Sequence, residues 1–274
     1  MNVKKDASGR RSIAVETEVP GTPEEVWQAI ATGPGISSWF VPTEFQERDG
    51  VPVSLTMHFG PGMDDVARVT AWDPPRRYSA ESDGLGPNAP TLATEWIVEA
   101  RSGGTCLVRV VQSLFTETDD WDSHLESMEG GWSTFFRILN LYLRHFRGQR
   151  ATTLRVMSVI DGSPSQAWNT LTGPLNVAGA TPGQRLTTSG DPRLSGFVEP
   201  RGPGVPEHTL LLRIDEPAPG IVSIFAHTDG KRVYVGMDFL LYGDDASAAA
   251  ARIEPVWQAW LAERFPAARN LSGV

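Results

Sequence analysis

One helix opening occurs twice in this chain, and this repeat limits the possible folds more than any other feature of the sequence. The first copy reads GTPEEVWQAIATGP (residues 21–34) and the second reads GSPSQAWNTLTGP (residues 162–174). Each copy has a hydroxyl residue at the N-cap position, proline at the first helical position and Glu or Gln three residues after the cap: Thr22, Pro23 and Glu25, then Ser163, Pro164 and Gln166. Residues of this kind cap the free N–H groups of a helix start. Each copy therefore predicts a helix that ends at its Gly-Pro pair, and the chain as a whole predicts two related halves.

Each half continues with the same order of elements. An alternating strand precedes each repeated helix, at residues 13–19 and 154–160, and a long helix with apolar residues at helical spacing closes each half, at residues 128–146 and 253–265. Further strands are expected at residues 53–59, 65–72, 77–81, 92–100 and 105–115, and in the second half at residues 196–199, 208–214, 221–227 and 232–241. We therefore predict an α+β protein of two domains, residues 11–148 and residues 151–267. Each domain is expected to be a curved antiparallel sheet wrapped around a long C-terminal helix, with a cavity where the sheet curves away from the helix.

The composition fits globular domains in a reducing compartment. The chain has 274 residues, of which 40% are hydrophobic. Its 24 basic and 33 acidic residues give a net charge of −9, which disfavours nucleic acid and acidic membrane surfaces as partners. The sequence shows no bilayer-spanning apolar run and no signal peptide. A single cysteine, Cys106, allows no internal disulfide, so we expect a cytoplasmic protein.

Several phrases of the first half resemble the SRPBCC or START-like helix-grip superfamily, and more closely its AHSA-type domains, which are named for the activator of the heat-shock-protein ATPase. In chain order they are VPGTPEEVWQAIATGPGISSWF (19–40), VTAWDPPRRYSAES (69–82), GGT (103–105) and EGGWSTFFRILNLYL (129–143). The resemblance covers residues 13–146 well and residues 152–265 weakly, as a divergent second copy. It implies two helix-grip domains in tandem and a hydrophobic cavity for a small molecule or lipid. It implies no fixed chemistry, since members of the wider group bind lipids, hormones or polyketides, act as cyclases or contact a chaperone.

The candidate ligand-binding residues are mainly aromatic and apolar. Trp96 and Val98 share one face of a predicted strand by period two, and Trp132 and Phe136 lie one turn apart on the closing helix. The full candidate set is Trp39, Phe40, Leu55, Met57, Trp96, Val98, Arg109, Trp132 and Phe136. Because aromatic residues also fill cores, a pocket plugged by its own tryptophans is the alternative.

Two polar residues are open to opposite interpretations. An inward-facing Arg109 would need a partner and could bind a ligand carboxylate or phenolate, whereas arginine is more commonly solvated on the outer face. His58 is the first choice for a general base, but the sequence indicates no carboxylate to orient it. A register slip of one residue would exchange the inward and outward faces of every strand.

Other features have simpler explanations. The acidic run at residues 117–126 is typical of a helix start rather than a metal site, because it lacks the glycine turn and spacing of a calcium loop. Gly130 and Gly131 indicate either a bend inside the closing helix or a helix that begins after them. The segment HTDGKR (227–232) predicts a surface turn. Common metal, phosphate-binding and nucleophile motifs do not occur in the sequence.

Three functions follow as hypotheses. The first is a non-catalytic cytoplasmic protein that binds an apolar small molecule or lipid in the first domain, without a cofactor or metal; the shorter second domain is expected to have a smaller cavity or none. The second is a cyclase-like or hydrolase-like enzyme that uses His58 or Arg109. The third is a protein-interaction module related to stress or to a chaperone.

Overall fold

The N-terminal half folds around one antiparallel sheet. The computed structural model describes residues 3–7, 9–60, 62–83, 90–116, 121–177, 179–188, 193–228, 231–266 and 269–270. The chain divides into two compact units, Met1–Gly148 (unit 1) and Gln149–Val274 (unit 2). Each unit has its own sheet and its own helices, so each is described by itself.

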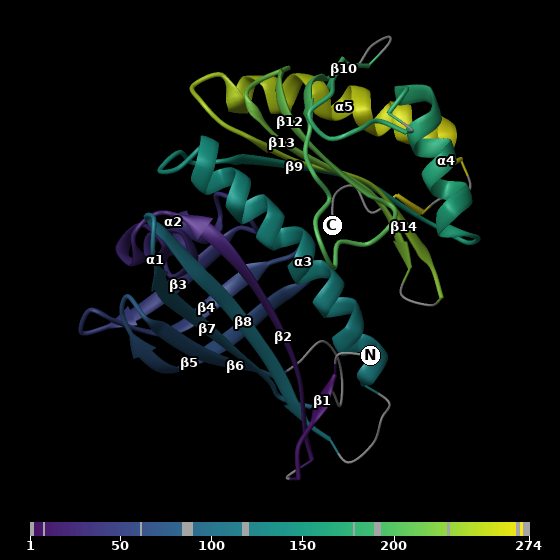
Figure 1. The fold of residues 1–274 in the computed structure, drawn as a ribbon. Coiled ribbons are helices and arrows are strands. Elements are labelled where there is room, and N and C mark those ends of the chain that lie inside the picture. Colours follow the sequence, from purple (N-terminus) through teal and green to yellow (C-terminus); the bar gives the residue numbers. More distant parts are fainter. Residues whose placement is uncertain are drawn as a thin grey trace. The chain divides into compact units, whose positions relative to one another are not determined.

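The sheet of unit 1 contains eight strands among the described residues, in the order β1-β2-β8-β7-β6-β5-β4-β3. Their bounds are β1 (Lys4–Lys5), β2 (Arg10–Pro20), β3 (Thr43–Arg48), β4 (Val51–His58), β5 (Asp64–Asp73), β6 (Arg77–Ser82), β7 (Leu92–Arg101) and β8 (Thr105–Phe115). Two short helices, α1 (Pro23–Ile30) and α2 (Gly33–Ile36), connect β2 to β3, and the long helix α3 (Asp122–His145) follows β8. Figure 1 shows α3 lying across the sheet. This is the predicted α+β arrangement of a sheet around a closing helix.

The inner face of this sheet, which we define as the face that α3 covers, follows from strand alternation. On β8 the side chains of Val108, Val110 and Gln112 are buried, whereas Arg109 and Val111 between them are half-buried. Across the strands Trp96 pairs with Val110, and Thr94 pairs with Gln112. Cross-strand partners point to the same side of a sheet, and the prediction that Trp96 and Val98 share one face of their strand is confirmed.

Helix α3 is fastened to β2 at both of its ends. Near its start, Arg11 Nη1 lies 2.6 Å from Asp122 Oδ2, and near its end Asn140 Nδ2 donates to the carbonyl oxygen of Glu18 at 2.8 Å. The helix begins at Asp122 and contains Gly130 and Gly131. The alternative in which it begins after these glycines is therefore wrong. The apolar positions that follow them bury enough surface to hold the helix in place.

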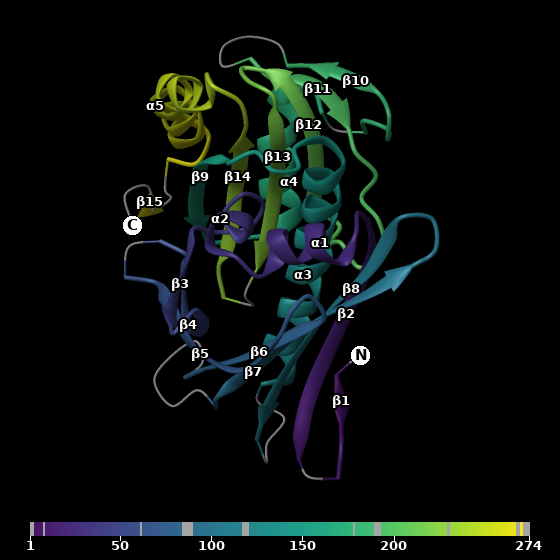
Figure 2. The same ribbon diagram turned by 90° about the vertical axis from the view of Figure 1, so that its left-hand side faces the viewer.

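Unit 2 repeats the same plan with a smaller sheet. Its strands β9 (Thr152–Ile160), β10 (Arg185–Thr187), β11 (Ser195–Val198), β12 (Thr209–Glu216), β13 (Gly220–Thr228), β14 (Val233–Leu241) and β15 (Arg269–Asn270) are ordered β10-β11-β12-β13-β14-β9-β15 within the described residues. Helices α4 (Pro164–Leu175) and α5 (Ala246–Arg264) share one core with the sheet. Figure 2 shows the strands of this sheet together with both helices. The core of unit 2 therefore includes the repeated helix as well as the closing helix.

The repeated helix opening folds differently in its two copies. In α1 the Thr22 hydroxyl accepts from the N–H of Glu25 at 3.3 Å, and the Glu25 carboxylate accepts from the N–H of Thr22 at 2.9 Å. This capping box confirms the prediction, and the bond from the Thr22 N–H to the carboxylate is the main reason why the pKa of Glu25 lies below its ordinary value. In α4 the N-cap Ser163 forms no side-chain cap hydrogen bond. The predicted second box is therefore wrong, although Ala167 and Leu171 of this helix are buried as its apolar spacing predicts.

The Gly-Pro pairs also do not end the helices as predicted. In the first copy α1 ends at Ile30, and Gly33 and Pro34 begin α2. In the second copy α4 runs through Gly173 and Pro174 and ends beside Asn176, which has a φ of 55°. Proline fits the first positions of a helix, which explains its place in α2.

Candidate functional site

Five of the predicted site residues form one cluster in unit 1. We call Trp39, Phe40, Trp96, Trp132 and Phe136 the aromatic cluster. Their ring centroids are linked by short steps: Trp39 to Trp96 at 6.2 Å, Trp96 to Trp132 at 5.1 Å, Trp96 to Phe136 at 5.9 Å, and Phe40 to Trp132 at 5.4 Å. Trp39 and Phe136 are almost fully buried, whereas Phe40 is half-buried. The cluster lies between the inner face of the sheet and α3.

The sequence places these rings through three different elements. Trp39 follows α2 directly, and its indole N–H donates to the carbonyl oxygen of Ala29 at 2.9 Å, which fixes the ring against α1. Trp96 reaches the inner face by alternation along β7. Trp132 and Phe136 stand four residues apart on α3 and therefore project from the same side of the helix.

Gln112 adds a polar group to this aromatic wall. Its Oε1 accepts from the indole N–H of Trp132 at 2.7 Å, and its Nε2 donates to Thr94 Oγ1 at 3.3 Å. Gln112 is 5% exposed, and a buried amide requires such partners. The site predicted from the sequence did not include Gln112. The signal that could have found it is an amide at a position of β8 whose neighbours on the same face are all apolar.

The remaining apolar candidates lie on the inner face outside the cluster. Val98 is buried on β7, and Leu55 packs with Ala67 and Ala80 in a small group of buried residues. Met57 is half-buried and packs against that group. Leu55 and Met57 extend the candidate site along the sheet to β4, whereas Val98 lies two residues from Trp96 on β7.

Arg109 and His58 do not belong to the inner face. Arg109 lies on the opposite face of β8, where its Nη2 is 2.8 Å from Glu16 Oε2. His58 lies on the face of β4 opposite to Leu55, and its Nδ1 is 2.9 Å from Asp64 Oδ1. His58 does have a carboxylate partner, but both groups are exposed. The prediction that Arg109 contacts a ligand in the cavity is therefore corrected, and so is an enzyme mechanism built on either residue, because strand alternation directs both side chains outward.

Two ionisable groups missed from the sequence do face inward. The Tyr78 hydroxyl donates to the carbonyl oxygen of Ile30 at 3.0 Å, and burial raises its pKa. Asp65 lies on β5 with the same alternation as buried Ala67, and burial raises its pKa while a hydrogen bond from Ser82 lowers it. An acid at an inward position of a predicted strand is the signal that could have identified Asp65.

Cys106 has the properties of a structural residue. It is fully buried, and its Sγ lies 3.3 Å from the carbonyl oxygen of Gly21. Burial raises the pKa of the thiol, and the nearby carboxylates of Glu24 and Glu25 raise it further. A thiol with a raised pKa is a poor nucleophile at neutral pH.

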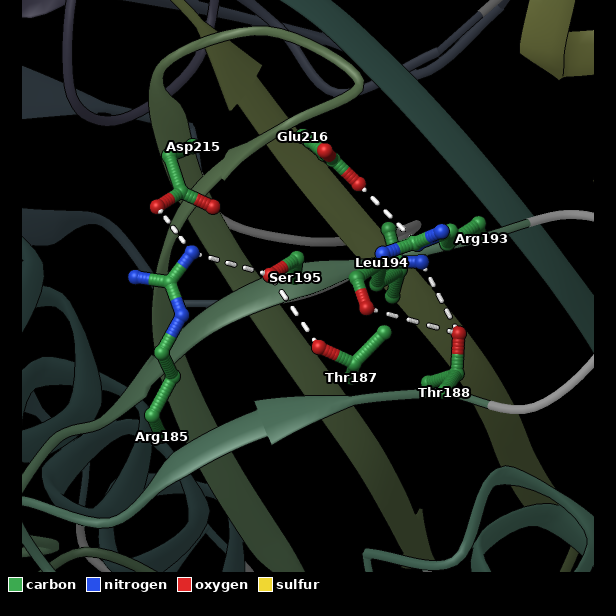
Figure 3. Close-up of polar contacts among 8 residues, drawn as sticks. All are labelled: Arg185, Thr187, Thr188, Arg193, Leu194, Ser195, Asp215 and Glu216. Carbon is green, nitrogen blue, oxygen red and sulfur yellow. Dashed lines mark hydrogen bonds and ion pairs between the residues drawn. The ribbon is translucent and has the colours of Figure 1, made fainter.

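Unit 2 has a group of ion pairs and ring contacts on three strands of its sheet. Arg185 donates to Asp215 at 2.6 Å and to Ser195 at 3.1 Å, as Figure 3 shows. The Phe197 ring lies 5.1 Å from the guanidinium carbons of both Arg185 and Arg213. These contacts connect β10, β11 and β12. Exposed pairs of this kind contribute about 0–1 kcal/mol each, so the group is a strand connection rather than a binding site.

A serine and a histidine also meet on unit 2. Ser165 Oγ and His208 Nε2 are 2.9 Å apart, and the His208 ring stacks on Trp168 at 5.8 Å. Among the described residues, no carboxylate is hydrogen-bonded to His208, and Ser165 is exposed. The pair therefore lacks the orienting group of a nucleophilic triad.

The predicted turn at Asp229 and Gly230, and Asp120 of the acidic run, lie outside the described residues.

Comparison with known proteins adds the family of unit 1. Residues 20–144 match the family "Activator of Hsp90 ATPase homolog 1-like protein". Unit 1 is therefore an AHSA-type helix-grip domain, as its sequence phrases indicate. No curated protein matches the chain.

Solved structures of low sequence identity also match. The di-domain ARO/CYC BexL from the BE-7585A biosynthetic pathway is 12% identical, with 93% of this chain and 95% of that chain covered and a TM-score of 0.45. DynU16, from the dynemicin biosynthetic locus, is 18% identical, with 93% and 97% covered and a TM-score of 0.41. The Aha1 dimer from Colwellia psychrerythraea is 20% identical, with 50% and 98% covered and a TM-score of 0.38.

Within the described residues, no helix has both the length and the apolar character that crossing a bilayer requires.

Proposed function

We propose that unit 1 binds an apolar small molecule on the inner face of its sheet, beside the aromatic cluster. The observation that carries the proposal is incomplete burial of inward-facing side chains. Phe45, Met57, Val69 and Thr94 all project from the inner face, yet each remains half-buried. Solvent therefore reaches this part of the face, and an apolar ligand would replace it favourably.

Small side chains support the same location. Ala67 on β5, Ala80 on β6 and Thr94 on β7 are neighbours across three adjacent strands or diagonal to one another. Large rings flank these small side chains on several elements: Trp96 on β7, Trp132 on α3, Phe45 on β3, Trp72 on β5 and Tyr78 on β6. A surface with a small floor and an aromatic wall fits a flat or branched apolar molecule. The AHSA-type family of unit 1 is consistent with a binding role.

Thermal unfolding with a panel of apolar molecules tests the proposal. A ligand that binds only the folded state raises Tm in proportion to its saturation. Ala80→Met would place a larger side chain on the inner face, whereas Ser79→Met adds a similar side chain to the outer face of the same strand. We expect binding to be lost in Ala80→Met and kept in Ser79→Met.

Native mass spectrometry of the freshly purified protein provides a second measurement. A small molecule released on unfolding would identify the chemical class of the ligand. If no compound shifts Tm and no molecule is released, the proposal fails, and the protein-interaction hypothesis gains support.

A further inference from the structure

Asp65 is an acid on the apolar face where we place the ligand. It pairs across the sheet with Met57 on β4, and its nearest inward neighbour along β5 is Ala67, which is buried. Asp64, the preceding residue, points the other way and pairs with His58. Alternation along β5 thus places one of two consecutive carboxylates outside the sheet and the other inside.

The inner carboxylate has no cationic partner. Among the described residues, Asp65 forms no ion pair, and the partner that the structure gives it is the Ser82 hydroxyl. A carboxylate has about four acceptor positions, so one hydroxyl leaves most of them open. Burial of a carboxylate with so few partners is costly, and this is why its pKa is raised.

Several other charges of unit 1 have partners of opposite sign. Arg11, which is buried on the inner face, is paired with Asp122 of α3. On the outer face Arg68 pairs with Glu81 at 2.7 Å and Arg77 pairs with Glu95 at 3.8 Å. Asp65 therefore leaves an uncompensated negative charge on the inner face of a chain whose net charge is already −9.

Ring contacts connect the residues that follow Met57 to the aromatic cluster. Phe59 lies two residues beyond Met57, which is the cross-strand partner of Asp65. The centroid of the Phe59 ring lies 5.9 Å from that of Phe40. Phe40 in turn contacts Phe135 at 4.5 Å and Trp132 at 5.4 Å. Aromatic faces attract cations, so the rings and the Asp65 carboxylate both favour a ligand with a positive charge.

We propose that the inner face of unit 1 recognises an organic ammonium ion, whose N–H groups donate to the Asp65 carboxylate while its apolar part lies against the aromatic cluster. This inference rests on the proposed function and adds the charge and the anchoring residue of the ligand. The negative net charge would also draw such a ligand toward the protein.

Three ligands of one shape test the proposal. Naphthylmethylamine is cationic at pH 7, naphthylmethanol is neutral and naphthoate is anionic. Affinities are measured by titration calorimetry for the natural chain, for Asp65→Asn and for Asp64→Asn, which removes the neighbouring carboxylate from the outer face. The ratio of amine to alcohol affinity, compared between variants, cancels the difference in hydration between the two ligands.

We expect the amine-to-alcohol ratio to fall about tenfold or more in Asp65→Asn and to stay unchanged in Asp64→Asn, because a hydrogen bond to a charged group is worth roughly that factor. Ser82→Ala, which leaves the carboxylate in place, should keep the preference for the amine and so controls for disturbance of β5 and β6. If the amine-to-alcohol ratio is unchanged in Asp65→Asn, or if it falls equally in Asp64→Asn, the inference is wrong. If the alcohol binds but the amine has no advantage, only the inference fails; if none of the three binds, the proposed function fails with it.

Discussion

The hydrogen bond between Trp132 and Gln112 provides a sharp test of how the aromatic cluster is held. Trp132→Phe keeps a ring opposite Trp96 but removes the indole N–H, which donates at 2.7 Å to an amide oxygen that is buried. Gln112→Met removes the acceptor and leaves the indole N–H without its partner. The double variant replaces both polar groups with apolar ones.

The expected magnitudes follow from the burial of both partners. An unsatisfied buried group costs about 1–3 kcal/mol, whereas removing donor and acceptor together can be nearly neutral. Each single variant should therefore lower the free energy of unfolding by about 1–3 kcal/mol. The double variant should lose less than the sum, with a coupling energy of about 1–2 kcal/mol. Thr94→Val removes only the 3.3 Å bond from Gln112 Nε2 and should cost less than Trp132→Phe.

Hydrogen exchange read on peptides of β7, β8 and α3 is the suitable assay. A chain of two units need not unfold in one step, and exchange reports the opening free energy of unit 1 separately. A coupling energy below about 0.3 kcal/mol, which is within the error of additivity, would refute the conclusion that this bond fixes the cluster.

Three further predictions concern stability. Burial raises the pKa of Asp65, so the folded chain binds a proton at this carboxyl group more tightly than the unfolded chain does. The ionised carboxylate therefore destabilises the fold at pH values above the pKa of the unfolded state. Asp65→Asn should therefore raise Tm at pH 7, and calorimetry across pH should show this gain vanishing below about pH 3.9. Gly35→Ala should destabilise unit 1 by about 3 kcal/mol or more in urea titrations, because the added Cβ would overlap the Gln28 carbonyl oxygen. Gly131→Ala should stabilise α3 by about 1 kcal/mol, because the added Cβ would lie 3.7 Å from its nearest neighbour, a ring carbon of Phe135. Units 1 and 2 expressed separately should each give a cooperative melt, because each has its own sheet and core; a flat melt for either unit contradicts this.

Local rules predicted the parts of this fold that depend on neighbours in sequence. The capping box at Thr22 and Glu25 is such a case, because its two hydrogen bonds join residues three apart. The alternation of β7 is another, because side chains two residues apart on a strand, such as Trp96 and Val98, lie on the same face. Ser163 shows the limit of these rules: the same pattern of residue types begins a helix there without forming the box.

Contacts that depend on the register between strands were beyond the reach of the sequence. Glu16 and Arg109 are cross-strand partners on β2 and β8, and their pairing decides that Arg109 serves the outer face. His58 and Asp64 face each other in the register of β4 and β5. A single sequence predicts neither register, so it could not show that His58 has a carboxylate or that Asp65 lacks a cation.

The comparison of the two units explains why we place the ligand in the first. In unit 2 the inner positions Val222, Ile224 and Met237 are fully buried, and Trp257 of α5 is sealed among them. Both α4 and α5 contribute to that core, so two helices cover the sheet. In unit 1 helices α1 and α3 also pack on the sheet, yet Met57, Val69 and Thr94 keep part of their surface exposed. A repeated plan thus gives one filled core and one incompletely covered face, and the incompletely covered face carries Asp65, a carboxylate that forms no ion pair with the residues that the structure describes.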